Sequence, residues 1–285
     1  MGAPVSNTHV RELATATPGR PASDGDGVRM TRIIGTPELN MLDPFLLLDA
    51  FGSDQPQDYI GGFPSHPHRG FETVTYLLAG RMRHTDNAGN EGVIEPGGVQ
   101  WMTAGRGIVH SEMPEQENGL LQGFQLWVNL PARAKMTAPG YQEYPPEGVP
   151  LERREDGTQV RVVAGTTSAG TTGAVHNDWV KPTYLDVTLP PGIDFEQPVG
   201  AGDNAFLYVI EGGLSVGAAR KPLAQGTLGI LGPGDQVRVS AENGARFLLV
   251  SAQPLNEPVA RGGPFVMNTR EEIAQAFEDY RHNRF

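Results

Sequence analysis

The chain contains, at residues 66–80, the stretch His66-Pro-His-Arg-Gly-Phe-Glu-Thr-Val-Thr-Tyr-Leu-Leu-Ala-Gly80. Its second half, from Thr73 to Leu78, is rich in β-branched, aromatic and aliphatic residues and ends near a glycine, which is typical of a β-strand that leads into a turn. Its first half carries two histidines at positions i and i+2. Because side chains two residues apart on a strand point to the same side, the stretch predicts a β-fold with two imidazoles on one face.

The rest of the chain repeats this pattern of short strands and tight turns. The chain has 37 glycines and 24 prolines, which suits many turns better than long helices. Turn sequences such as Asp86-Asn-Ala-Gly89 and Glu95-Pro-Gly-Gly98 separate the apolar runs. The pattern indicates an antiparallel all-β fold, with further strands expected at residues 31–34, 45–48, 123–129, 184–189, 205–210, 227–231, 236–240 and 246–252.

The two halves of the chain resemble each other weakly. Thr75-Tyr-Leu-Leu-Ala-Gly80 is similar to Leu207-Tyr-Val-Ile-Glu-Gly212, and each precedes a strand and a Pro-Gly turn. We therefore expect a duplicated β-domain. The predicted boundaries are a flexible leader at 1–28, an N-terminal metal-binding domain at 29–135, a connection at 136–175, and a C-terminal domain at 176–285 that ends in a helix.

The last segment has a different pattern. Thr269-Arg-Glu-Glu272 has the form of a capping box, and Ile273, Ala276, Phe277 and Tyr280 follow at helical spacing. A short amphipathic C-terminal helix is predicted, packed on a barrel.

Composition excludes several classes of protein. Lys and Arg total 22 against 33 Asp and Glu, for a net charge of −11, and no dense basic run is present, so direct nucleic-acid binding is disfavoured. The absence of cysteine excludes disulfides, thiolate catalysis and cysteine-based zinc sites. No apolar stretch is long enough for a signal sequence or a membrane span, so we expect a cytoplasmic protein without membrane contact.

A second pair of candidate ligands, His110-Ser-Glu112, has the same i, i+2 spacing as His66 and His68. Two such pairs on facing strands would direct four ligand groups to one interior point. Three imidazoles and one carboxylate suit a transition metal such as Fe, Ni, Cu or Zn. Glu72 also follows His68 at a spacing used in small metal-binding β-barrels, the cupins, and spacing alone does not choose between Glu72 and Glu112.

Three segments resemble the pirin family. They are His66 to Tyr76, Gln100-Trp-Met-Thr-Ala-Gly-Arg-Gly-Ile-Val-His-Ser-Glu-Met-Pro114, and Gln125-Leu-Trp-Val-Asn-Leu-Pro131. The similarity extends to Asp43-Pro-Phe-Leu-Leu-Leu-Asp49 and Gly263-Pro-Phe-Val-Met-Asn268, and it is looser in the connection and the second domain.

The resemblance implies a fold and a site. Pirins are bicupins, so the chain would form two tandem cupin (jelly-roll-type) β-barrel domains with a short C-terminal helix. The family's ligands carry over onto His66, His68, His110 and Glu112, all present here, and Glu72 then becomes a neighbour of the site. The implied metal is iron (Fe2+/Fe3+), although other divalent transition metals suit the same ligands.

The resemblance also implies an activity, since some members show quercetin 2,3-dioxygenase activity. The first hypothesis is therefore a metal-dependent oxygenase that cleaves flavonols, with Glu112 as the catalytic base. The alternative is a non-catalytic, iron-dependent redox-sensing protein that binds a regulatory protein partner. A third reading is a metal that only stabilises the barrel.

Other side chains near these motifs receive less specific interpretations. His84 is read as a strand-surface residue, and His176, alone in its region, leaves the C-terminal domain without a metal site of this kind. Arg69 and Arg106 fit a structural ion pair or a substrate contact equally well. Four aromatic or sulfur-containing residues are expected in the core or in a pocket wall: Trp101, Met102, Phe124 and Trp127.

Overall fold

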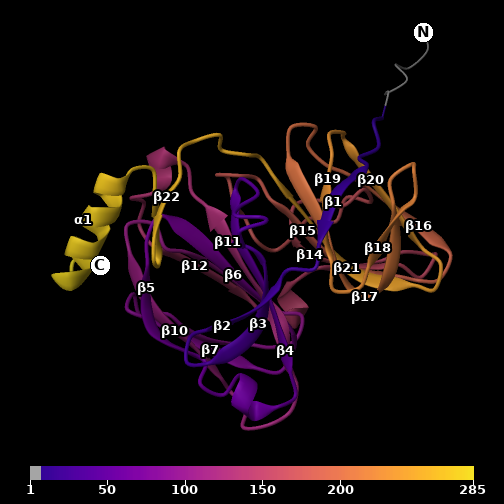
Figure 1. Ribbon diagram of the computed structural model, residues 1–285. Helices are drawn as coiled ribbons and strands as arrows, with labels where there is room; N and C mark the ends of the chain where they lie inside the picture. The colour runs from indigo at the N-terminus through magenta and orange to yellow at the C-terminus, as the bar shows by residue number, and fades with distance from the viewer. Residues whose placement is uncertain (1–7) are drawn as a thin grey trace. The chain divides into compact units, whose positions relative to one another are not determined.

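The computed structural model describes residues 8–285, and β-strands dominate it (Figure 1). The chain forms two compact units, neither of which is one continuous segment. The N-terminal unit comprises Gly19–Val149 and Leu255–Phe285. The C-terminal unit comprises Pro150–Pro254 together with the segment that ends at Pro18.

The N-terminal unit consists of two antiparallel sheets and a two-stranded ribbon. The seven-stranded sheet has the order β12-β9-β6-β11-β4-β3-β2, and the four-stranded sheet has the order β5-β10-β7-β8. Their strands are β2 (Arg20–Asp24), β3 (Val28–Ile34), β4 (Phe45–Ser53), β5 (Phe63–His68), β6 (Phe71–Ala79), β7 (Met82–Asp86), β8 (Glu91–Ile94), β9 (Val99–Thr103), β10 (Ile108–Pro114), β11 (Leu121–Asn129) and β12 (Gly140–Tyr144). The ribbon pairs β22 (Ala260–Gly262) with β23 (Phe265–Met267), and short 3-10 turns lie at Pro56–Asp58, Ala132–Ala134 and Pro146–Gly148.

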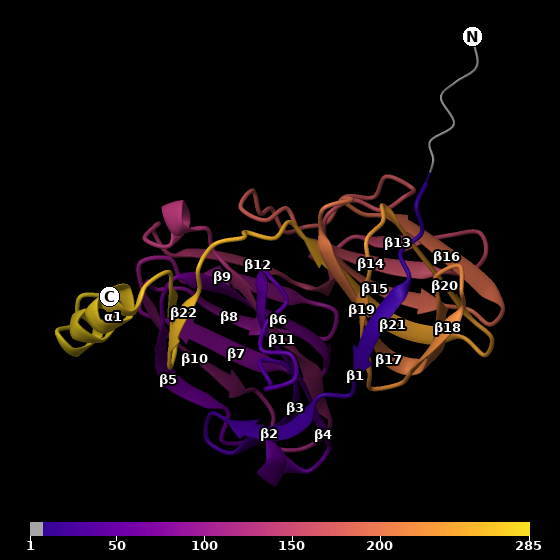
Figure 2. The ribbon, with the colours of Figure 1, turned by 45° about the horizontal axis from the view of Figure 1, so that its top comes forward.

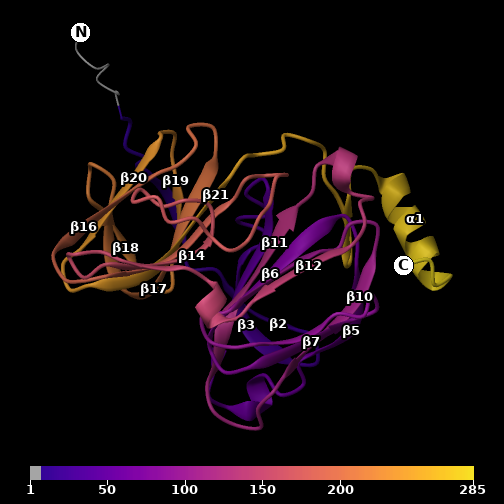
Figure 3. The same ribbon diagram turned by 180° about the vertical axis from the view of Figure 1, so that it is seen from behind.

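An apolar cluster joins the two sheets of this unit. Val28, Phe51 and Leu77 come from the larger sheet, and Met82 and Ile94 come from the smaller one. All are nearly inaccessible to solvent. Burial of these side chains holds the sheets face to face at one end, while the histidine-bearing strands β5 and β10 run side by side in the smaller sheet (Figure 3).

The C-terminal unit is a ten-stranded sheet with the main order β1-β19-β17-β21-β15-β14-β13. Strand β20 shows why these sequences form strands, because Val237, Val239 and Ala241 alternate with more exposed neighbours and point into the core. Figure 2 shows β15, β21 and β17 together in this unit. The strands are β1 (Leu13–Thr17), β13 (Leu151–Arg153), β14 (Gln159–Ala164), β15 (Thr183–Leu189), β16 (Ile193–Pro198), β17 (Asn204–Val216), β18 (Lys221–Ala224), β19 (Leu228–Leu231), β20 (Gln236–Ala241) and β21 (Ala245–Ala252).

The two units share one strand order. The path β9-β6-β11-β4-β3 in the N-terminal unit corresponds to β19-β17-β21-β15-β14 in the C-terminal unit. The similar sequences at Gly80 and Gly212 lie on β6 and β17, which occupy the same place in this order. The prediction of an all-β chain with two related domains is therefore confirmed, although the sheets are open in residues 8–285 rather than continuous closed barrels.

The chain ends are more ordered than the predicted leader suggested. Residues 1–7 of that leader lie outside the described residues, but Leu13–Thr17 pairs with β19 and Arg20–Asp24 pairs with β3. These edge strands are short and largely exposed, so they lack the apolar alternation by which strands are recognised in sequence. The predicted connection at 136–175 likewise contains the strands β12, β13 and β14.

The C-terminal helix α1 spans Arg270–Arg281 (Figure 1). Its capping box is confirmed: Thr269 accepts a hydrogen bond from the backbone of Glu272, and the Glu272 side chain accepts one from the backbone of Thr269. The helix packs on the ribbon β22–β23, which belongs to the same N-terminal unit. Within residues 8–285, no helix has the length and apolar character needed to cross a membrane.

Candidate metal centre

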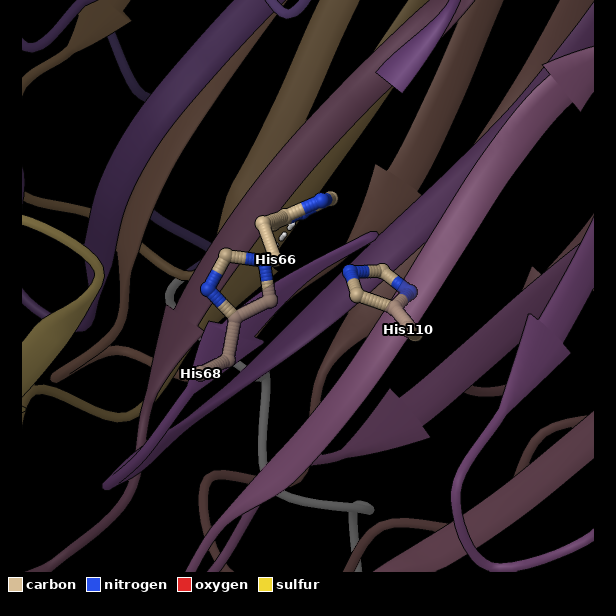
Figure 4. Close-up of side chains that lie close together, drawn as sticks. All are labelled: His66, His68 and His110. Carbon is tan, nitrogen blue, oxygen red and sulfur yellow. Dashed lines mark hydrogen bonds between the residues drawn. The ribbon is translucent and has the colours of Figure 1, made fainter. Parts of the chain in front are cut away.

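Three histidines meet on two neighbouring strands of the smaller sheet. His66 and His68 lie near the end of β5, and His110 lies on β10, directly opposite His66 in the antiparallel register. Their candidate ligand atoms all lie within 4.8 Å of one another. Figure 4 shows the three rings turned toward a common space. The i, i+2 spacing places His66 and His68 together, and the pairing of β5 with β10 adds His110.

The three rings are close enough to share one ion. Their centroids are 4.7 Å apart for His66 and His68, 4.4 Å for His66 and His110, and 4.9 Å for His68 and His110. The Nε2 atoms of His66 and His68 are 3.0 Å apart. His110 Nε2 is buried and has no hydrogen-bond partner among the described residues. A buried nitrogen without a partner is costly, and a metal ion would satisfy it.

Each ring has a neighbour at its other nitrogen. His66 Nδ1 lies 2.8 Å from the carbonyl oxygen of Pro64, and His68 Nδ1 lies 3.4 Å from that of Pro264. His110 Nδ1 lies 3.4 Å from His84 Nδ1. Because a carbonyl oxygen accepts a hydrogen bond from Nδ1–H, Nε2 of neutral His66 and of neutral His68 is left with a lone pair. These two Nε2 atoms and the unpartnered Nε2 of His110 form a nitrogen donor set that fits a transition-metal ion.

Burial favours the neutral form of these histidines. Loss of hydration, with a smaller effect of His66, lowers the pKa of His68 to about 3. Burial and then the neighbouring imidazoles of His68, His66 and His84 lower the pKa of His110 well below its usual value. Neutral imidazole is the form that binds metals.

Glu112, the predicted fourth ligand, lies on the same strand as His110. Its side chain is buried, and the Thr75 hydroxyl donates a hydrogen bond of 2.6 Å to its Oε1 atom. It is not part of the three-histidine group, so its coordination of a metal remains a prediction. Glu72 is also buried and accepts a hydrogen bond from Thr103.

A cavity of about 800 Å³ opens onto this site within the N-terminal unit. Its volume is in the range of small-molecule pockets. The wall is apolar or aromatic beside nine polar or charged lining residues, which are Asp24, Asp26, Arg32, Asp49, His66, His68, Glu112, Gln125 and Arg261. The apolar lining residues are Met30, Leu47, Phe51, Phe63, Trp127 and Val266. The other three residues expected in the core or a pocket wall, Trp101, Met102 and Phe124, are buried.

Two residues near the ligands have structural surroundings that the sequence did not reveal. Arg69 is buried and forms an ion pair of 2.8 Å with Asp279 of α1, which supports its structural interpretation. The interpretation of His84 as a strand-surface residue is wrong, because its side chain is fully buried beside His110. The spacing His84-Thr-Asp86 has the same i, i+2 form as the ligand pairs, and this signal could have indicated an inward position.

Family models match both units. The pirin model matches residues 27–128, and the model of the pirin C-terminal cupin domain matches residues 184–285. A pirin-like protein of Caulobacter vibrioides is 56% identical over 97% of this chain and 99% of that protein. The chain belongs to the pirin family.

Human pirin and one solved structure are also similar to this chain. Human pirin is 45% identical over 95% of this chain and 93% of its own length. A crystal structure titled as quercetin 2,3-dioxygenase from Acinetobacter baumannii has a TM-score of 0.89 and 35% identity, covering 97% of this chain and 99% of that one. The chain is therefore a pirin-family protein with two cupin domains. It also has a histidine cluster that could hold a metal.

Proposed function

We propose that this chain is an iron-dependent dioxygenase that cleaves flavonols such as quercetin. The observation that supports it most directly is the convergence of three histidines, two of which, His66 and His68, line a cavity of about 800 Å³. The name of the Acinetobacter relative supports the choice of substrate. In the proposed site the metal is held by His66, His68 and His110 through Nε2, with Glu112 as the fourth ligand.

The cavity is suited to a flat polyphenol. Phe63 and Trp127 supply aromatic surface on which such rings can pack. Apolar side chains such as Met30 and Val266 lie in the same wall, and His66, which is only partly buried, lines the same cavity. A flavonol would enter with its hydroxyl and carbonyl oxygens toward the histidines.

The protein's own contribution to the chemistry is proton transfer and orientation. A bound iron ion supplies a Lewis acid and a redox centre for reaction with dioxygen. Glu112 accepts the proton of the flavonol 3-hydroxyl, and Thr75 holds the Glu112 carboxylate in place through its hydrogen bond. Overall, one dioxygen is consumed per flavonol, the central ring opens and carbon monoxide leaves.

The test combines metal analysis with an oxygen-uptake assay on the same purified sample. The iron-loaded protein should consume dioxygen and quercetin in equal amounts and release carbon monoxide. Glu112→Gln keeps the shape of the side chain but removes both the base and the proposed carboxylate ligand, so turnover per bound iron, with iron content measured on the same sample, should fall by about 10²- to 10⁴-fold. A fully iron-loaded protein that leaves the quercetin absorbance unchanged would contradict the proposal and favour the regulatory alternative.

A further inference from the structure

A chain of three buried polar side chains extends from the candidate metal centre into the smaller sheet. Strand β7 pairs with β10 on the side opposite β5, and it carries His84 and Asp86. His84 Nδ1 lies 3.4 Å from His110 Nδ1, and His84 Nε2 lies 3.2 Å from Asp86 Oδ2. The side chains of His84 and Asp86 are completely inaccessible to solvent.

The hydrogen bonds at Asp86 identify it as an acceptor. Its Oδ1 accepts the backbone N–H groups of Ala88 and Asn90, at 2.9 and 3.0 Å. Its Oδ2 accepts the side-chain amide of Asn90 at 2.8 Å. With donors at both oxygens, the group is a carboxylate, and the ring nitrogen of His84 that faces it must carry a proton.

The proton on His84 Nε2 determines which nitrogen of His110 is protonated. A neutral His84 that donates from Nε2 has its lone pair on Nδ1. His110 Nδ1 faces this lone pair and therefore donates its own proton to it. The remaining nitrogen, His110 Nε2, then keeps its lone pair and is the buried atom without a partner at the candidate metal centre.

We propose that His84 and Asp86 are positioning residues that fix the tautomer and the ring orientation of His110 as a metal ligand. This inference rests on the metal-binding part of the proposed function and does not require flavonol turnover. Partners that accept the second N–H of a metal-binding histidine contribute about 10- to 100-fold to metal affinity.

His66 and His68 differ from His110 in the kind of group that lies at Nδ1. His66 and His68 each face a backbone carbonyl, of Pro64 and Pro264. A carbonyl partner is retained when a side chain is substituted. His110 is the member of the group whose partner is itself a side chain, so its orientation depends directly on the residue at position 84.

A pair of substitutions at position 84 separates this role from simple packing. Glutamine has an acceptor oxygen for His110 and an NH₂ donor for Asp86, so His84→Gln can keep the chain of hydrogen bonds. Phenylalanine keeps the ring that packs against Tyr141, with centroids 4.9 Å apart, but has no polar atom. If packing alone matters, His84→Phe should be the milder change; if the hydrogen bonds matter, His84→Gln should be.

Asp86→Asn provides a second test that keeps the ring of His84. If its amide oxygen continues to serve the turn, its NH₂ group faces His84 Nε2 and requires an acceptor there. The proton of His84 would then lie on Nδ1 instead of Nε2, and that of His110 on Nε2 instead of Nδ1. His110 Nε2–H would point at the metal position. This variant should lower metal affinity about as strongly as His84→Phe.

Two measurements on the full chain decide the question. In the metal-free protein, ¹⁵N chemical shifts of the histidine rings should show His110 protonated at Nδ1 in the wild type and at Nε2 in Asp86→Asn. Competition of a chelator for Co(II), with the visible Co(II) spectrum as a report of coordination, should show affinity weakened about 10- to 100-fold in His84→Phe and less in His84→Gln.

Each outcome supports or overturns the inference. Equal losses in the two position-84 variants, a milder effect of phenylalanine, or His110 protonated at Nε2 in the wild type overturns it. Absence of Co(II) binding by the wild type overturns both this inference and the proposed metal site. Co(II) binding in the expected order, without quercetin turnover by the iron-loaded protein, supports the positioning role and rejects the dioxygenase alone.

Discussion

The two units share one strand order, but corresponding rows of side chains are polar in the N-terminal unit and apolar in the C-terminal unit. In the N-terminal unit, one row of directly paired residues across β3, β4, β11, β6 and β9 is polar: Arg32, Asp49, Gln125, Thr75 and Gln100. In the C-terminal unit, the row across the corresponding strands β14, β15, β21 and β17 is apolar: Val162, Leu185, Leu249 and Leu207. Arg32, Asp49 and Gln125 of the first row line the cavity, and the second row belongs to the main hydrophobic core.

The strand that carries His110 and its counterpart in the C-terminal unit show the same difference in polarity. In the N-terminal unit β10, between β5 and β7, carries His110 and Glu112. In the C-terminal unit β20 lies between β16 and β17 and carries Val237 and Val239. One unit therefore keeps an open, polar interior that can hold an ion and a ligand, whereas the other fills that space and gains stability from it.

The largest expected effect comes from removing a histidine of the candidate metal centre. His110→Ala should abolish metal binding and quercetin turnover, since it removes one of three imidazoles from the centre. The matched control is His176→Ala, an exposed histidine of the C-terminal unit, which should leave both unchanged. Metal content by elemental analysis measures the difference. Full metal content in His110→Ala would contradict the placement of the metal site at these histidines of the N-terminal unit.

A polar residue introduced into the leucine row should destabilise the C-terminal unit. Leu249 is fully buried, so Leu249→Gln loses apolar burial and leaves an amide without partners, at a cost of about 3–5 kcal/mol. Urea unfolding followed by circular dichroism measures the loss, and the affinity for Co(II) should stay as in the wild type. A cost below about 1 kcal/mol would show that this interior tolerates polar groups.

Metal removal should affect the two units unequally. A metal present at about 100 times its dissociation constant stabilises the state that binds it by ~2.7 kcal/mol. On chelation, backbone amides of β5 and β10 should exchange hydrogen faster, while those of β15 and β21 should keep their protection. Equal acceleration in both units would argue that the metal stabilises the whole chain, as the third reading of the sequence supposed.

The reciprocal substitution should have the smallest effect. Gln125 is only partly buried and shares the Thr75 hydroxyl with Glu112, so Gln125→Leu should change stability by less than about 1 kcal/mol. The expected change is in the KM for quercetin, because the side chain lines the cavity. A loss as large as that of Leu249→Gln would mean that the polar row is a structural requirement of the fold.

Much of the fold was predictable because it is encoded locally. Strands such as β6 and β11 have β-branched and aromatic residues bounded by turns, and the histidine pairs show their common face through i, i+2 spacing. The capping box of α1 is likewise contained within four residues. These features depend on neighbours in sequence, which a single chain displays.

The features that the sequence did not reveal depend on contacts between residues that are far apart in the chain. Strand β1 is added to β19, and the segment that contains Pro264 returns to place a carbonyl beside His68. The burial of His84 follows from the register between β7 and β10. None of these partners is near its counterpart in the chain, so composition could not identify them, and the one periodic signal was the i, i+2 spacing of His84 and Asp86. Iron as the metal and a cytoplasmic location remain predictions.

Anomalous diffraction from crystals of the metal-loaded protein, at the absorption edge of the metal, tests the central claim most directly. The account predicts one ion in the N-terminal unit, at about 2.1 Å from Nε2 of His66, His68 and His110, and none in the C-terminal unit. An ion bound elsewhere, or coordinated through Nδ1 of these histidines, would contradict it.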